Sequence, residues 1–181
     1  DLLEYNRKHI EYPKKPIDLG FANALELHAT YTRAQAFAAL GHYTLTEKSA
    51  AGSQEGILHL EDKKADVFLV TLNKTEKHYS PTTMYKDYAV NEQLFHWQSQ
   101  SATSASTETG RRYIEHERRG SRVLLFVREF NKINGVTQPY IFLGTARYRS
   151  HEGSRPMSII WELDYPMPAG FFLKANKMVV G

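Results

Sequence analysis

The spacing of apolar residues in the first third of the chain predicts one short helix. Thr32 is a good N-cap, and Gln35 three residues later completes a capping box. Ala34, Phe37 and Ala38 are placed on one face of this helix, and a glycine at position 41 would end it. Residues 18–29 are ambiguous, because their apolar positions could line a helix but the segment is short. The first helix is therefore predicted at residues 32–40.

From residue 55 onward the pattern becomes typical of strands. The runs GILHL (56–60) and DVFLVTL (66–72) are rich in branched and aromatic residues, and the polar EDKKA between them predicts a hairpin. Further strands are predicted at 94–100, 121–130, 140–149 and 157–163, and Asn134-Gly135 is a hairpin turn signal. The predicted fold class is α+β, with a curved, mostly antiparallel sheet that forms a barrel or half-barrel.

Two segments near the strands are predicted to be helical or to close the fold. A helix is expected to open near residue 106 or 107 and to end at Gly120. Gly110 inside it costs up to about 1 kcal/mol relative to alanine, which suggests a close approach by another backbone, such as DNA. The tail FFLKANKMVV is expected to be a closing strand or helix.

Residues 80–101, SPTTMYKDYAVNEQLFHWQSQS, combine aromatic rings with one carboxylate and a run of amides and hydroxyls. Rings beside short hydrogen-bonding groups suit a planar polar ligand, of which a nucleobase is the commonest. A carboxylate only accepts hydrogen bonds, so it would select an amino edge such as that of cytosine. The alternative is structural: strand alternation would place Phe95 and Trp97 in the core, with Tyr85 and Tyr88 packed under a loop. Composition alone favours this structural alternative.

Composition narrows the possible functions without choosing one. The chain has 181 residues, 41% hydrophobic and 24% charged, which suits a single domain. The absence of cysteine excludes disulfides, thiolate metal sites and cysteine nucleophiles. A net charge of +3 is mildly basic, and no apolar stretch suggests a membrane partner. No cofactor, metal site or catalytic residue is predicted, and a cytoplasmic location is expected. Residues 1–16 are predicted to be a linker or N-terminal extension of a domain at 17–181, cut from a longer chain.

Four blocks of the sequence carry a resemblance to a known family. They are SPTTMYKDYA, LFHWQSQS, LLFVRE and SHEGSRPMSIIWEL, in this order. The chain resembles, from about Tyr31 to about Pro168, the domain of unknown function at the C-terminal end of certain bacterial helicases. Those proteins also carry a phospholipase-D-like nuclease domain and include SauUSI-like type IV modification-dependent restriction enzymes. The resemblance implies an SRA-like domain that binds double-stranded DNA and flips out a modified cytosine, 5-methylcytosine or 5-hydroxymethylcytosine. It also implies nuclease and helicase domains of a parent polypeptide as partners.

By analogy with SRA-like pockets, an aromatic residue and an aspartate would be followed by a second aromatic on the next strand. Tyr85 and Trp97 are then the predicted stacking walls, Tyr88 is the alternative wall, and Asp87 would bind the cytosine amino group. The Tyr-x-Asp spacing is tighter than in better-known SRA domains. The full predicted base pocket is Tyr85, Asp87, Tyr88, Trp97, Gln98 and Ser99.

Basic side chains are predicted to contact the DNA backbone or a groove. Arginine forks match phosphate oxygens, but interleaved glutamates make a surface ion-pair network an equal alternative for the arginines at 111–122. The loop at 150–156 could fill the gap left by a flipped base or be an ordinary polar turn. The predicted contacts are Lys74, Lys77, Arg111, Arg112, Arg118, Arg119, His151, Ser154 and Arg155.

Two other functions remain open from the residues alone. Glu61 and Lys63 resemble the E-x-K half of a metal-dependent nuclease motif, which would need a second carboxylate. Asp18 is far upstream and is a poor candidate for it. Docking of RNA or of protein partners is the third possibility.

Overall fold

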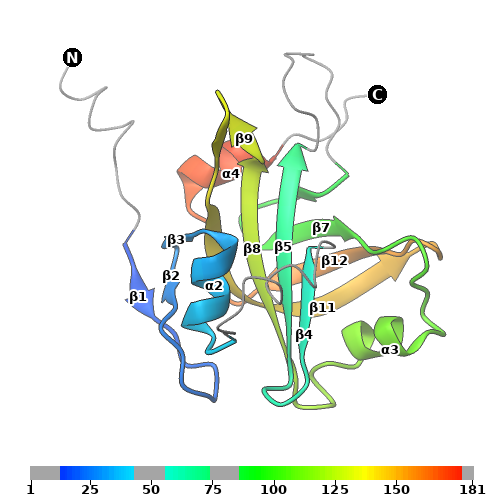
Figure 1. The fold of residues 1–181 in the computed structure, drawn as a ribbon. Helices are drawn as coiled ribbons and strands as arrows, with labels where there is room; N and C mark the ends of the chain where they lie inside the picture. Colours follow the sequence, from blue (N-terminus) through cyan, green and yellow to red (C-terminus); the bar gives the residue numbers. More distant parts are fainter. Residues whose placement is uncertain (1–12, 43–55, 74–85, 177–181) are drawn as a thin grey trace, which may run out of the picture.

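A computed structural model describes residues 13–42, 56–73 and 86–176 (Figure 1). The helices are α2 (Arg33–Ala39), α3 (Glu108–Ile114) and α4 (Ala169–Ala175). The short strands are β1 (Lys15–Pro16), β2 (Glu26–Leu27), β3 (Thr30–Tyr31), β6 (Tyr88–Ala89), β9 (Lys132–Ile133) and β10 (Val136–Thr137). The longer strands are β4 (Ile57–Leu60), β5 (Ala65–Asn73), β7 (Leu94–Gln98), β8 (Arg122–Phe130), β11 (Tyr140–Glu152) and β12 (Ser158–Leu163).

A mixed sheet forms the body of the domain, with the order β4-β5-β8-β11-β12-β7-β6 and with β3 paired to β11. All of its pairings are antiparallel except β5 with β8. The described strands end at β4 on one side and β6 on the other, so their hydrogen bonds do not close a barrel. The α+β class and the mostly antiparallel sheet are as predicted.

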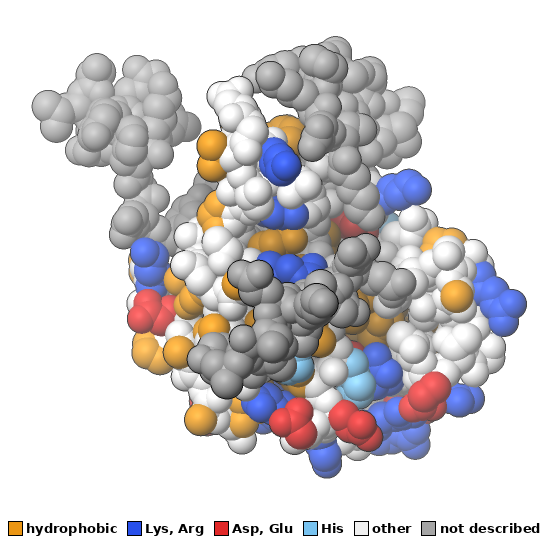
Figure 2. Space-filling view, in the orientation of Figure 1, with side chains coloured by type: hydrophobic (Ala, Val, Ile, Leu, Met, Phe, Trp, Pro, Cys, Tyr) orange, Lys and Arg blue, Asp and Glu red, His pale blue; other side chains and the backbone are white. Residues whose placement is uncertain are grey.

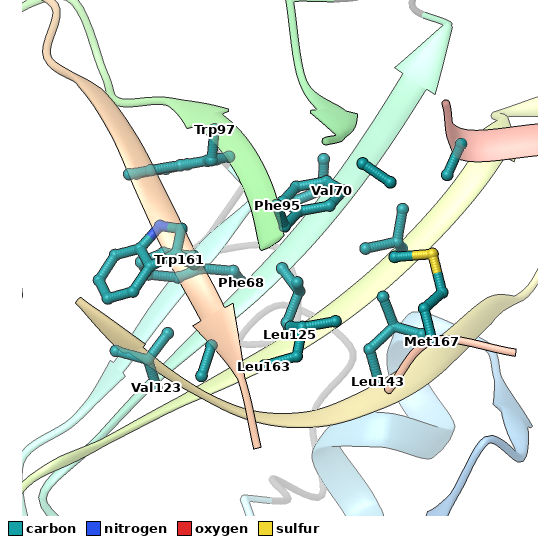
Figure 3. Close-up of a cluster of buried hydrophobic side chains, with 14 of the residues drawn as sticks. Phe68, Val70, Phe95, Trp97, Val123, Leu125, Leu143, Trp161, Leu163 and Met167 are labelled. Atoms are coloured by element: carbon teal, nitrogen blue, oxygen red, sulfur yellow. The ribbon is translucent and has the colours of Figure 1, made fainter. Parts of the chain in front are cut away.

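The sheet is strongly curved, because side chains from strands far apart in its order touch. Three strands separate β5 from β7, yet Phe68 on β5 stacks against Trp97 on β7 with ring centroids 4.5 Å apart. In Figure 1, β7, β12 and the second half of β11 cross β5 and β8 at a large angle, whereas the first half of β11 pairs with β8. Figure 3 shows the resulting core, with Phe68, Trp97 and Trp161 packed against one another.

The hairpins predicted from residue 55 onward are present. β4 and β5 pair as an antiparallel hairpin, and β9 and β10 pair about the turn at Asn134 and Gly135. The predicted capping box of α2 is confirmed, because the Thr32 hydroxyl and the Gln35 side chain each bond the other's backbone N–H. Its predicted face is wrong: Ala36, Phe37 and Leu40 are buried, whereas Ala34 and Ala38 are exposed.

Other local predictions differ from the structure. The helix expected to run to Gly120 ends at Ile114, and residues 115–120 continue as turns. Gly110 is close to a backbone of its own chain, because a Cβ there would collide with the carbonyl oxygen of Ser104. Segment 18–29 contains no helix, since its apolar residues belong to loops and to the short strand β2. Lys15 and Pro16, within the predicted linker, pair with β2.

Candidate functional site

A cavity of about 490 Å³ opens between β5 and β7, where the curled sheet brings these strands together. It is lined by Arg33, Gly56, Ile57, Leu69, Val70, Thr71, Asp87, Trp97, Gln98, Ser99, Gln100, Arg128, Asn131 and Tyr140. Asp87, Trp97, Gln98 and Ser99, all predicted as base-pocket residues, line this cavity. The structure therefore brings together four of the six predicted residues.

Asp87 lies immediately before β6, and its carboxylate is buried against β7. The residue is 3% exposed, and its Oδ1 accepts a hydrogen bond of 2.8 Å from the backbone N–H of Gln98. This bond joins the segment before β6 to the end of β7 and fixes the carboxylate at the cavity wall. A carboxylate has about four lone-pair sites, so one hydrogen bond does not exhaust its capacity as an acceptor.

Trp97 belongs both to the core and to the cavity wall. The alternation predicted for β7 is confirmed, with Phe95 and Trp97 buried and Leu94, His96 and Gln98 half-buried. Trp97 is 5% exposed, with one ring face stacked on Phe68 and an edge-to-face contact with Tyr113. The structural alternative for this residue is thus correct, and the same ring also lines the cavity.

Ser99 ties the cavity to the end of the β11–β12 hairpin. Its backbone N–H donates to the carbonyl of Met157 at 2.8 Å, and its Oγ accepts from the N–H of Met157 at 2.9 Å. The hydroxyl also donates to the carbonyl of Gln100. Ser99 is therefore held by backbone groups on both sides.

The remaining two members of the predicted base pocket are Tyr88 and Tyr85. Tyr88 is on β6 and stacks on His96 of β7, with ring centroids 4.6 Å apart. It is not among the residues that line the cavity. Tyr85 lies outside the described residues, as do Lys74 and Lys77 of the predicted DNA contacts.

Sequence reasoning missed the two arginines of the cavity. Arg33 is in the first turn of α2 and Arg128 is on β8, and neither belongs to the predicted set of site residues. Arg128 donates through Nε to the Thr71 hydroxyl and through Nη1 to the carbonyl of Gln138, both at 2.9 Å. Its guanidinium lies 4.2 Å from the ring centre of Tyr140. The sequence feature that could have pointed to Arg128 is its position as a single arginine within the apolar run VLLFVREF.

The arginines of and after α3 are engaged in ion pairs. Arg111 and Arg119 bind Glu108, and Arg118 and Arg119 bind Glu115. These bonds lower the pKa of both glutamates. The surface-network alternative thus describes this segment, while its contact with DNA stays a prediction.

Arg112 points inward rather than outward. It makes a bidentate pair with Asp66 of β5, whose side chain is 1% exposed, and the shortest of its bonds is 2.9 Å. His59 Nδ1 lies 3.0 Å from the same carboxylate. Burial alone would lower the pKa of Arg112, but its bonds to Asp66 raise it. Arg112 therefore anchors α3 to the sheet.

The loop between β11 and β12 has the form of a polar turn. His151 accepts or donates a 2.6 Å bond with the Tyr148 hydroxyl, and Ser154 and Arg155 are exposed. The backbone N–H of Arg155 donates to Thr103, which fixes the loop beside the segment that leads into α3. Its exposed side chains remain candidates for DNA contact.

The nuclease alternative gains no support from the geometry. Glu61 is exposed on the turn between β4 and β5, and Lys63 pairs with its neighbour Asp62. Asp18 Oδ1 caps the N–H of Gly20. In the described ranges, no three or more acidic or histidine side chains are grouped as a metal ion requires.

The described residues form an α+β fold with a curved sheet and a polar cavity that has an aromatic wall. The chain belongs to the DUF3427 family, described as a domain of unknown function, whose model matches residues 25–174. No curated protein matches the chain. Within the part of the chain that the structure describes, the helices are too short or too polar to cross a membrane.

Proposed function

We propose that the cavity captures a modified cytosine flipped out of duplex DNA, as the target-recognition part of a type IV restriction enzyme. The supporting observation is that Asp87 and Trp97, from separate segments, border one cavity together with Gln98 and Ser99. A volume of about 490 Å³ falls within the roughly 300–1,000 Å³ typical of small-molecule sites. A flipped base needs such a concave site, because it is read outside the stack.

The walls of the cavity suit a pyrimidine with an amino group and a methyl group. The Asp87 carboxylate can accept the N4 amino hydrogens of cytosine while it keeps its bond to Gln98. Ile57, Leu69 and Val70 add apolar surface that a 5-methyl group could contact. One buried methyl is worth about 0.8 kcal/mol, or a preference of about fourfold. A larger preference would require a close apolar fit around the methyl group.

The curl of the sheet supports an SRA-like half-barrel. The contact of Phe68 with Trp97 brings β5 and β7 together across the concave side, next to the cavity. In this proposal the half-barrel holds the base, and the hairpins at its rim meet the duplex.

Two hairpins border the cavity and are suited to contact the duplex. The β9–β10 hairpin begins beside Asn131, which lines the cavity, and exposes Ile133 and Val136 at 46% and 64%. The β11–β12 loop, with exposed Ser154 and Arg155, is joined to Ser99 through Met157. Apolar and polar side chains at these positions could fill the gap that a flipped base leaves.

Cleavage and translocation would come from nuclease and helicase domains of a longer cytoplasmic polypeptide. This chain would supply recognition alone and would require no cofactor of its own. Binding should weaken steeply with salt if the basic side chains contact phosphates.

The test is a comparison of Asp87→Asn with wild type on two duplexes that differ only in one 5-methylcytosine. Asparagine lacks the second carboxylate oxygen. Its one remaining carbonyl oxygen can serve either Gln98 or the base. Fluorescence anisotropy should show a preference for the methylated duplex in wild type and its loss in the variant. Asp62→Asn is the matched control, because Asp62 is an exposed carboxylate on the β4–β5 turn. Equal affinity of the wild-type protein for both duplexes would refute the proposal.

A further inference from the structure

We infer that Arg33 and Arg128 form an anion subsite in this cavity, which binds a phosphate group of the captured nucleotide. This inference rests on the proposed function for the identity of the nucleotide. The subsite itself follows from the side chains that face the cavity from α2, β8 and β11.

Arg128 is a half-buried cation whose hydrogen-bond partners are neutral. Its Nε and Nη1 donate to the Thr71 hydroxyl and the Gln138 carbonyl. Among the described residues no carboxylate forms an ion pair with it. The Tyr140 ring, 4.2 Å from the guanidinium carbon, holds the planar group in place. A fixed, half-buried charge without a counter-ion is costly, and an anionic ligand would compensate it.

A second cation lines the same cavity. Arg33 extends from the first turn of α2, where its guanidinium lies 5.2 Å from the ring of Phe37. Burial lowers the pKa of Arg128, and the nearby charge of Arg33 lowers it further, while Tyr140 acts in the opposite direction. Both guanidinium groups line the same cavity, so an anion bound there would be attracted by two positive charges.

The cavity is therefore polarised across its width. The side formed by β7 and the segment before β6 carries Asp87, Trp97 and Gln98. The side formed by β5, β8 and β11 carries Thr71, Arg128 and Tyr140, and blue side chains gather over β5 and β8 in the centre of the face shown in Figure 2. A ligand with an amino edge at one end and a negative charge at the other fits this arrangement.

A nucleotide has both features. Arginine forks bind phosphate oxygens with two parallel hydrogen bonds, and the planar guanidinium of Arg128 is already oriented by Thr71, Gln138 and Tyr140. The hydroxyl of Thr71 and the amide of Asn131 supply further polar groups on that side. The subsite would thus select nucleotides over free bases and would add affinity independent of base identity.

The inference can be tested by calorimetric titration of the 181-residue protein with small probes. These are 5-methyl-deoxycytidine, its 5′-monophosphate, its 3′-monophosphate, and deoxyadenosine monophosphate. At least one monophosphate of 5-methyl-deoxycytidine should bind tenfold or more tightly than the nucleoside. Arg33→Gln should reduce that difference to less than threefold, whereas Arg128→Lys, which retains the charge, should retain part of it.

Arg149→Gln is the matched control, because Arg149 is 65% exposed, pairs with Glu162 and lies outside the cavity lining. It should leave the tenfold difference intact, and thermal melting should show that all three variants are folded. Equal binding of nucleoside and monophosphates, or no binding of any probe at millimolar concentration, would overturn the subsite. If monophosphates bind through the arginines but deoxyadenosine monophosphate binds equally well, the subsite stands and the proposed cytosine reading fails. If the methylated nucleoside binds and phosphate adds no affinity, the proposed cytosine reading stands and the anion subsite fails.

Discussion

Replacement of Arg112 by methionine separates an anchoring role from a DNA-binding role. The substitution leaves Asp66, 1% exposed, without its bidentate partner, while His59 remains 3.0 Å away. Removal of one member of a buried ion pair costs about 3–5 kcal/mol, because the other charge stays buried and uncompensated. The Arg112 side chain is 18% exposed and His59 can still bond Asp66, so we expect a loss near 3 kcal/mol.

The assay is urea unfolding followed by circular dichroism. With a slope of about 2 kcal/mol per molar urea, a loss of about 3 kcal/mol moves the midpoint down by about 1.5 M. Arg111→Met is the matched control, because Arg111 is half exposed and its one ion pair among the described residues is with exposed Glu108, so its midpoint should change by less than about 0.5 M.

The double variant Asp66→Asn with Arg112→Met adds a second check. It removes both charges, so it should be more stable than Arg112→Met alone. An Arg112→Met protein with unchanged stability would refute the anchoring role. Weaker DNA binding by such a protein would then assign Arg112 to the phosphate contacts.

Three further variants test the packing of the core and of α3. Trp97→Ala should cost about 3–5 kcal/mol in urea unfolding because the ring stacks on Phe68, and a loss below about 1 kcal/mol would contradict its place in the core. Gly110→Ala should destabilise by about 1–3 kcal/mol despite the better helix propensity of alanine, since the new Cβ meets the Ser104 carbonyl; a gain in stability would show that this contact is misplaced. Burial raises the pKa of Tyr113 from 10.0 to about 12. The contribution of this tyrosine to folding stability is therefore complete below pH 10 and is lost as the pH rises toward 12. Tyr113→Phe should therefore lessen the fall in stability between pH 10 and 12, and an unchanged fall would exclude this tyrosine as its source.

The elements with strong local signals were predictable from sequence. The capping box of α2, the β4–β5 hairpin and the alternation of β7 depend on neighbours within a few residues, and each is confirmed. The parallel pairing of β5 with β8 was not predicted, because it joins segments about fifty residues apart with no local signature.

Only the side of the cavity formed by residues 87–99 was predictable from the sequence. Four of the cavity residues lie within thirteen residues of sequence, in one stretch that is rich in aromatic and polar side chains: Asp87, Trp97, Gln98 and Ser99. That stretch was therefore enough to predict them together. Arg33 and Arg128 reach the cavity from distant elements, and only the curl of the sheet brings them there. Arg112 was misjudged for a related reason, since its partner Asp66 is on a strand far upstream.

The most direct test of the account is to observe where the methyl group lies in the complex. A duplex with one ¹³C-labelled 5-methyl group can be titrated with the protein and followed by NMR. A flipped base in the cavity should give a shifted methyl resonance with nuclear Overhauser contacts to Trp97 and to the methyl groups of Ile57 or Val70, which line the cavity. A methyl resonance that keeps its duplex position at saturating protein, without contacts to these side chains, would contradict the account.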